Sequence, residues 1–416
     1  ENGEIVEVQP NNEIWYTSSD GNVVTPYKTN VFGATIISNE YNNGKGVITF
    51  DGYVTSIGED AFSNCTRLTS VNIPDSVTEI GEDAFYYCTS LKEFTGKFAE
   101  DNGRILVVDG VLTAFAPAGI TEYNIPDSVT KIGYAAFDGC NSLTSVNIPD
   151  GVTTIGERAF AWCISLTSVN IPDSVTTIGN YAFKRCSSLT SVTIPDSVTE
   201  IGIEVFRCCA NITNVTIGDG VKTINEYTFA ECSSLISVTI GASITTIWKG
   251  AFSDCTSLTS VTIPDSVTKI GDIPFTGCTN LKNVYCKPIT PPIGGSMMFI
   301  HYIFGGGSYP IECTIYVPME SVEAYKSAEY WNEYASAIVG YDFGDSGLVT
   351  PEIDDSWKIH YTATSKVTPY DTSAFNVEIL SNKWDSTTGE GVITFNGVVE
   401  TIDSYAFYMC SNLKSV

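Results

Sequence analysis

A cysteine that recurs every 23 residues constrains this chain more than any other feature. The period is read from neighbouring cysteines, since 186 − 163 = 23 and 209 − 186 = 23. With one longer interval, the series comprises Cys65, Cys88, Cys140, Cys163, Cys186, Cys209, Cys232, Cys255 and Cys278. A phenylalanine stands three residues before each of these cysteines, from Phe62 to Phe275. A fixed period of roughly 20–50 residues indicates stacked units, none of which can bury its apolar face alone.

Each unit contains one strand followed by a turn. Leu143, Val146 and Ile148 follow the L-x-x-L-x-L pattern of a leucine-rich repeat strand, in which Val146 and Ile148 share the inward face. Pro149 and Asp150 then turn the chain. The sequence predicts a leucine-rich repeat solenoid, a right-handed superhelix built mostly of strands and turns with short helical turns. We expect its units to share one continuous core.

The repeated unit resembles that of a known family. The pattern I-P-x-S-V-T-x-I-G-x-x-A-F-x-x-C is similar to the BspA-like leucine-rich repeats of bacterial surface proteins, and it extends over nearly the whole chain. The resemblance implies a rigid, non-catalytic scaffold that binds an extracellular protein. It also implies a secreted or cell-surface location.

The repeats divide the chain into segments. We expect a β-rich N-terminal cap at 1–58, followed by a repeat solenoid at 59–285 with a hairpin insertion at about 94–122. A C-terminal cap with one helix should follow at 286–343, and a linker at 344–356. Residues 357–416 should form a second copy of the N-terminal cap with the start of a repeat.

Two observations support these bounds. The interval between Cys88 and Cys140 exceeds the period by 29 residues, and it contains Asp109-Gly110 between two apolar runs, a strong hairpin signal. We expect this hairpin to project from the solenoid as a structural decoration, with a binding loop as the alternative. Residues 389–416 match residues 44–71 at a constant offset, since 407 − 62 = 345 and 410 − 65 = 345.

Charge and hydropathy exclude several classes of partner. The formal net charge is −27 and the isoelectric point is about 4.2, which argues against nucleic acid and anionic membrane surfaces. The sequence contains no run of about 18 apolar residues, so it predicts no transmembrane helix. The chain begins at Glu1 instead of Met, so we expect a leader to have been removed. We expect the protein to be a monomer.

Catalytic and cofactor motifs are weak. Gly344-Asp345-Ser346-Gly347 matches a serine protease motif, but His301 and His360 are the only histidines and neither lies in a matching motif. The thirteen cysteines include no C-x-x-C pair, and the period of nine of them predicts a buried stack of reduced thiols. We therefore expect no enzyme activity, no cofactor and no metal.

A column of turn aspartates permits two readings. Its members are Asp127, Asp150, Asp173, Asp196, Asp219 and Asp265. Stacked carboxylates could bind calcium, which takes oxygen ligands. The favoured reading is that each carboxylate accepts hydrogen bonds from backbone amides of its own turn.

Two surfaces are candidate partner sites. The first, which we call the variable strip, lies near the Ala-Phe turns and consists of Arg158, Trp162, Tyr181, Lys184, Arg185 and Arg207. These residue types are frequent in binding hot spots, and a basic strip on an acidic protein would attract an acidic partner. Ordinary sequence drift in loops is the competing explanation.

The second surface is the outward side of the repeat strands, the usual concave binding face of such solenoids. Its residues are Ser145, Asn147, Ser168, Asn170, Ser191 and Thr193. They are small and uncharged, and exposed strands favour such residues without any ligand. The leading hypothesis is an adhesion module. The alternatives are a structural spacer without its own partner and a carbohydrate-binding surface protein.

Overall fold

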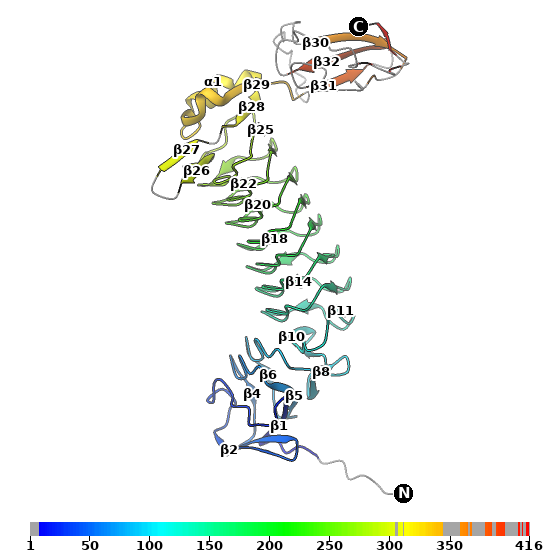
Figure 1. Ribbon diagram of the computed structural model, residues 1–416, viewed down its shortest axis with the longest axis vertical. Coiled ribbons are helices and arrows are strands. Elements are labelled where there is room, and N and C mark those ends of the chain that lie inside the picture. The colour runs from blue at the N-terminus through cyan, green and yellow to red at the C-terminus, as the bar shows by residue number, and fades with distance from the viewer. Residues whose placement is uncertain are drawn as a thin grey trace. The chain divides into compact units, whose positions relative to one another are not determined.

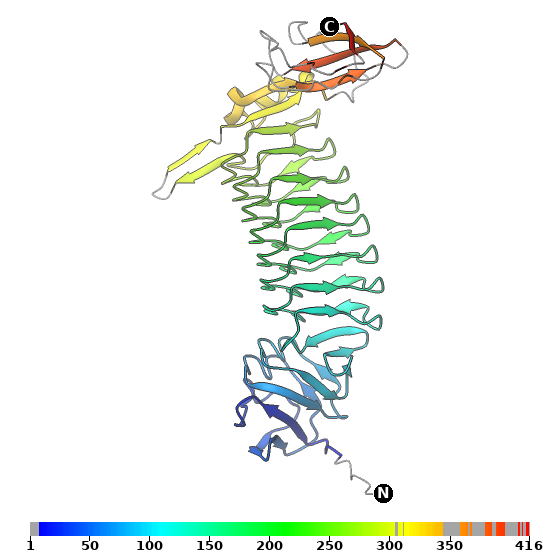
Figure 2. The same cartoon turned by 45° about the vertical axis from the view of Figure 1, so that its right-hand side comes forward.

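The computed structural model describes residues 8–303, 307–310, 312–343, 358–364, 367, 379–384, 388–395, 407, 410 and 413–415. The chain forms two compact units, Glu1–Tyr341 and Asp342–Val416. The first unit is a stack of coils (Figures 1 and 2), which confirms the leucine-rich repeat solenoid. No described helix is long and apolar enough to cross a membrane. The Gly344–Gly347 motif and the linker at 344–356 lie outside the described residues.

Each coil has three sides, and the first is the strand face. Inward residues such as Val146 and Ile148 are buried, whereas Asn147 between them is exposed. Most successive strands pair in parallel, as Ser191 with Asn214 one period apart. The strands are β5 (Leu68–Ile73), β7 (Glu93–Gly96), β11 (Glu122–Asn124), β13 (Ser145–Asn147), β15 (Ser168–Val169), β17 (Ser191–Ile194), β19 (Asn214–Ile217), β21 (Ser237–Thr239), β23 (Ser260–Ile263) and β25 (Asn283–Cys286).

The second side is the short-strand face, where each coil adds a two-residue strand to a parallel ladder. Thr154 pairs with Thr177, for example, and Ile155 pairs with Ile178. The strands are β4 (Ser56–Ile57), β6 (Glu79–Ile80), β12 (Lys131–Ile132), β14 (Thr154–Ile155), β16 (Thr177–Ile178), β18 (Glu200–Ile201), β20 (Thr223–Ile224), β22 (Thr246–Ile247) and β24 (Lys269–Ile270).

The third side is the turn face, which carries the Ala-Phe segments. Two residues of each segment have positive φ; in the Cys163 coil they are Arg158 (56°) and Trp162 (58°). Amides at alternate positions donate to the next coil: Arg158 to Asn180 O, Phe160 to Ala182 O and Trp162 to Lys184 O, at 2.7–2.9 Å. The turn face is therefore a third hydrogen-bonded ladder.

The core is a stack of phenylalanine rings with a column of thiols beside it. From Phe137 to Phe299 the ring centroids of neighbouring coils are 4.9–5.6 Å apart and nearly parallel. The thiol of Cys186 donates to Phe160 O of the preceding coil at 3.0 Å, and most column cysteines make the same bond. The nine column cysteines are buried and none of them is joined in a disulfide, in agreement with the expected stack of thiols. Burial raises the pKa of the Cys186 thiol well above its usual value.

The N-terminal cap covers the first coil with an antiparallel sheet. Its strands are β1 (Glu13–Ser18), β2 (Ile36–Asn42) and β3 (Lys45–Phe50), and β1 pairs with both β3 and β5. The cap thereby hydrogen-bonds to the strand edge that the first coil would otherwise expose.

The insertion does not project from the solenoid, so that expectation was wrong. Its strands are β8 (Ala99–Glu100), β9 (Ile105–Val108) and β10 (Val111–Phe115). β10 pairs in parallel with β12, so the hairpin takes the place of a coil on the short-strand face. The physical reason is that apolar residues lie on both sides of the hairpin, and six of them are buried: Ile105, Leu106, Val107, Leu112, Ala114 and Phe115.

The hairpin also divides the core, which contradicts the expectation of one continuous core. Ile105, Val107 and Phe115 pack with the coils that follow. Leu106 and Ala114 pack with the cap and the two preceding coils. Because alternate residues of a strand face opposite sides, one hairpin serves as the wall between two hydrophobic cores.

The C-terminal cap contains one short α-helix, as expected, with a 3₁₀ segment on each side of it. Its elements are β26 (Ile300–Ile303), β27 (Gly307–Pro310), β28 (Thr314–Pro318), η1 (Met319–Ser321), α1 (Val322–Ser327), η2 (Asn332–Ala337) and β29 (Ile338–Tyr341). The helix stops because Ala328 is extended and Tyr330 has a φ of 66°. The break lets the buried Trp331 ring pack on Tyr325, with centroids 4.9 Å apart, and donate to Pro292 O.

The second unit repeats the architecture of the N-terminal cap. Its strands are β30 (Lys358–Ala363), β31 (Ile379–Trp384), β32 (Glu390–Phe395) and β33 (Leu413–Ser415). Ile359 pairs with Ile393 just as Ile14 pairs with Ile48, at the offset of 345 seen in the sequence. Equal sequence patterns thus produce equal strand registers.

The phenylalanine stack makes a first prediction. Phe183→Ala should leave a cavity and lower the free energy of unfolding by about 3–5 kcal/mol, because the ring is fully buried between Phe160 and Phe206. Hydrogen exchange should speed up in the adjacent coils as well. The exposed control Asn170→Ala should change stability by less than about 0.5 kcal/mol. Faster exchange only in distant coils would contradict the shared core.

Candidate functional site

The structure brings the variable strip together on the turn face of three consecutive coils. Arg158 and Trp162 belong to the Cys163 coil, and Arg207 belongs to the Cys209 coil. Tyr181, Lys184 and Arg185 lie between them in the Cys186 coil. Arg158, Trp162, Tyr181 and Arg185 occupy the positive-φ positions.

Most cations of the strip are neutralised within the protein. Arg158 contacts Asp138 at 2.8 Å, and Lys184 contacts Glu204 at 2.7 Å. Arg207 pairs with Glu204 at 3.0 Å and with Glu231 at 2.7 Å. Although burial raises the pKa of Glu204, the hydrogen bonds from Lys184 and Arg207 lower it overall. The strip is therefore not a free basic patch, and its charge no longer argues for an acidic partner.

What remains exposed is aromatic and apolar, together with the guanidinium of Arg185. Trp162 is 43% exposed, Ile164 42% and Tyr87 42%. The Arg185 guanidinium lies 4.3 Å from the centroid of the Trp162 ring. We call Tyr87, Trp162, Ile164 and Arg185 the aromatic patch. The sequence did not lead us to predict Ile164 as a surface residue of interest, although the equivalent position holds Thr, Ser, Asn or Ala in the other coils.

The strand-face candidates line up along the strand face as expected. Asn147, Ser168, Asn170, Ser191 and Thr193 are exposed, whereas Ser145 is half-buried. Ser145 is in register with Ser168, one coil away. The face presents a flat row of small polar groups.

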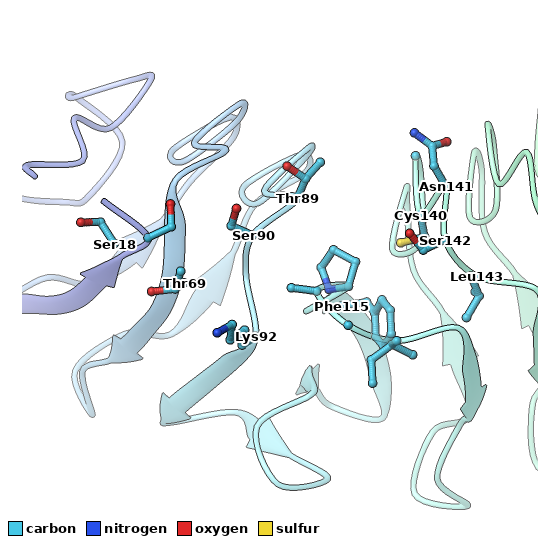
Figure 3. Close-up of a pocket in the computed structure, with 16 residues that line it drawn as sticks. Ser18, Thr69, Thr89, Ser90, Lys92, Phe115, Cys140, Asn141, Ser142 and Leu143 are labelled. Carbon is cyan, nitrogen blue, oxygen red and sulfur yellow. The ribbon is translucent and has the colours of Figure 1, made fainter. Parts of the chain in front are cut away.

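A pocket opens where the hairpin interrupts the stack. This junction pocket has a volume of about 570 Å³. Figure 3 shows Thr89, Ser90 and Lys92 on one side and Asn141 and Ser142 on the other. Phe115, Pro117 and Ile120 contribute apolar lining. The junction pocket could therefore take a polar group attached to an apolar one.

The turn-face ladder is broken beside this pocket. In the described part of the chain, the amides of Asp83, Phe85 and Tyr87 reach no acceptor in the Cys140 coil, and Tyr134 O and Ala136 O receive no donor. The Cys140 thiol likewise lacks the carbonyl bond made by most of its column, since the preceding coil is displaced. The hairpin replaces a coil on the short-strand face but supplies no turn segment, so a slit of about 40 Å³ remains.

Two carboxylates line this slit. Asp138 is buried and Asp83 is half-buried, and an Oδ1 atom of each is buried without a hydrogen-bond partner among the described residues. Burial raises the pKa of Asp138 to about 6, although Arg158 opposes the shift. Burial also raises the pKa of Asp83. Ionisation of the junction is thus energetically unfavourable.

The raised pKa of Asp138 predicts a pH dependence. The folded state binds the proton more tightly than the unfolded chain, so the contribution of Asp138 to stability is fully present below about pH 4 and is lost as pH rises through about 6. This one group should change the free energy of unfolding by about 2–3 kcal/mol. The difference between the wild type and Asp138→Asn should therefore vary over this pH range.

The measurement is chemical denaturation of both proteins between pH 4 and pH 7.5. Asp150→Asn, which removes an exposed carboxylate of a regular turn, provides the control. A flat profile for Asp138→Asn would contradict the buried, proton-binding carboxylate.

The turn aspartates act partly across coils. Asp196 Oδ1 accepts from the Asp219 amide at 2.8 Å, and Asp219 Oδ1 accepts from the Ala242 amide at 2.7 Å. Both acceptor–donor pairs are one coil apart, whereas the sequence reading placed the acceptor and donor in one turn. Among the residues that the structure describes, no group of three or more metal-ligating side chains is present.

The calcium reading remains open to a direct test. If these carboxylates only link coils, millimolar calcium and a chelator should produce the same melting temperature. A ligand that binds only the folded state raises that temperature. An increase with calcium that magnesium does not reproduce would therefore favour a specific site.

Comparison with known proteins identifies relatives of the repeat. A family described as "BspA type Leucine rich repeat region (6 copies)" matches residues 36–99, 112–236, 201–299 and 378–416. No curated protein matches the chain. A leucine-rich repeat protein from Bacteroides ovatus is 27% identical, with 73% of this chain and 90% of that chain covered and a TM-score of 0.36.

Two further solved structures are similar. A leucine rich cell surface protein from Faecalibacterium prausnitzii is 26% identical, with 68% of this chain and 95% of that chain covered and a TM-score of 0.30. The pneumococcal vaccine antigen PcpA is 17% identical, with 73% and 86% covered and a TM-score of 0.41.

Proposed function

Because the chain belongs to the BspA-type leucine-rich repeat family, we propose that it is a secreted or cell-surface adhesion module that binds an extracellular protein through the aromatic patch. The repeat family supports a protein-interaction scaffold. The exposed side chains of Trp162, Ile164 and Tyr87 are the observation that carries the choice of surface.

The backbone conformation at two of these exposed aromatic residues is unfavourable for the stability of the fold. Tyr87 and Trp162 both occupy the positive-φ position before the column cysteine, with φ of 56° and 58°. Gly and Asn adopt this conformation at lower cost than other residues, and Asn64 and Gly139 hold the same position in other coils. An exposed Trp there gains little burial in return. Residues that break a local rule without a structural benefit are expected at functional sites.

The patch also has the composition of a binding hot spot. Trp, Tyr and Arg dominate such sites, and Arg185 stacked on Trp162 holds a flat, rigid surface. Tyr87 lines the junction slit, which is next to the junction pocket. A partner side chain could enter that pocket while the aromatic patch excludes water around it.

The spacer hypothesis stays as the alternative, since a rigid stack of coils could separate other domains without a partner of its own. A broad interaction screen distinguishes the two. If no extracellular protein binds the full chain, the spacer reading is favoured.

The partner test uses variants that suit the local backbone. Trp162→Asn combined with Arg185→Asn should preserve folding, because Asn tolerates positive φ, and should weaken partner binding at least about tenfold. The matched control is Asn147→Ala with Asn170→Ala on the strand face. Immobilised extracellular proteins are the bait, and surface plasmon resonance measures affinity.

The opposite pattern would refute this placement. If only the strand-face pair weakened binding, the site would move to the strand face. Binding through the aromatic patch should also depend weakly on salt, because most of the nearby cations are already paired.

A further inference from the structure

A second recess lies on another part of the solenoid. It has a volume of about 530 Å³ and crosses several coils beside the short-strand face, from Glu157 to Trp248. Its lining includes Gly179, Gly202 and Asn225. We call it the tryptophan groove.

The groove coincides with a break in a repeat column. In most coils the residue after the short strand is glycine: Gly58, Gly81, Gly133, Gly156, Gly179, Gly202 and Gly271. A Cβ atom there would press on the backbone of the preceding coil; at Gly156 it would lie 2.7 Å from Ile132 O. Two successive coils nevertheless carry Asn225 and Trp248 at this position.

The structure accommodates these residues at a local cost. At Asn225 the side-chain Nδ2, in place of the backbone amide, donates to Ile201 O. Trp248 keeps the usual bond of its amide to Ile224 O at 2.8 Å. Neither residue extends the core, since both are half-buried at the surface. A costly departure from a packing rule without a core contact suggests a ligand.

The indole ring closes one end of the groove. Lys269 Nζ, from the following coil, lies 4.2 Å from the centroid of the Trp248 ring. The other groove residues belong to preceding coils. Trp248 lines the groove and is only half-buried, so part of its ring is accessible to a ligand there.

The remaining lining is polar and of mixed charge. Glu200 and Lys222 are exposed, and neither side chain has an ion-pair or hydrogen-bond partner among the described residues. Thr177, Thr223 and Asn180 add hydroxyl and amide groups. With Glu157, the charges comprise two carboxylates and one ammonium, which disfavours an anion. A single aromatic anchor disfavours an apolar peptide.

We propose that the tryptophan groove binds a neutral carbohydrate chain. The Trp248 ring stacks on one sugar, while the polar side chains exchange hydrogen bonds with hydroxyl groups. Such a combination of one aromatic surface with a few placed polar groups is typical of small-ligand sites. The site lies apart from the aromatic patch and does not depend on the proposed protein partner.

The repeat itself supplies the test variant. Trp248→Gly restores the residue that most coils hold, so it removes the stacking surface and should leave the melting temperature unchanged or higher. The full chain is titrated with cellohexaose, xylohexaose, mannohexaose, laminarihexaose and maltohexaose at up to millimolar concentrations. Calorimetry and tryptophan fluorescence report binding.

We expect at least one oligosaccharide to bind the wild type and Trp248→Gly to weaken that binding at least about tenfold. Trp162→Ala, which removes an exposed tryptophan elsewhere, should bind like the wild type. The proposal is overturned if no oligosaccharide of this panel binds, or if Trp248→Gly binds as well as the wild type. Protein-partner binding should survive Trp248→Gly, so the two proposals can fail separately.

Discussion

The register between successive coils is the constraint on which this structure depends. One displacement of 23 residues must simultaneously stack the phenylalanine rings, pair two parallel strand ladders and align the turn-face amides with carbonyls of the next coil. Each added coil repeats the same contacts with its neighbour, so stability is distributed along the stack. A change in coil length cannot satisfy all three sides at once.

The hairpin insertion shows what happens when the three sides are not satisfied together. β10 preserves the short-strand ladder through Val111 and Leu112, while the turn face loses its hydrogen bonds. Backbone amides, carbonyls and the Oδ1 atoms of Asp83 and Asp138 are left without partners at the junction, where burial raises the pKa of Asp138. The division into two cores, the junction pocket and the raised pKa of Asp138 thus share one cause.

The repeat, its period and the second cap were predictable because they depend on residue types that recur. The inward orientation of the hairpin was also readable, since a nearly continuous apolar run predicts a strand buried on both sides. The positive-φ positions were not, because Arg158, Trp162 and Tyr181 are poor predictors of that conformation. The ion pairs of the variable strip could not be predicted from the sequence, because each paired basic residue has an acidic partner in a different coil, as Arg158 has in Asp138.

In a repeat protein, each unusual residue can be compared with the residues at the equivalent position of the other coils. Seven coils hold glycine after the short strand, and four coils hold Gly, Asn or Asp at the positive-φ position before the column cysteine, so any other residue can be compared with its sister coils. Trp162 departs from the preference of the turn face, and Trp248 departs from the glycine column of the short-strand face. Neither ring adds to the core. Because neither ring is buried in the core, the two proposed binding sites offer one physical account of both tryptophans.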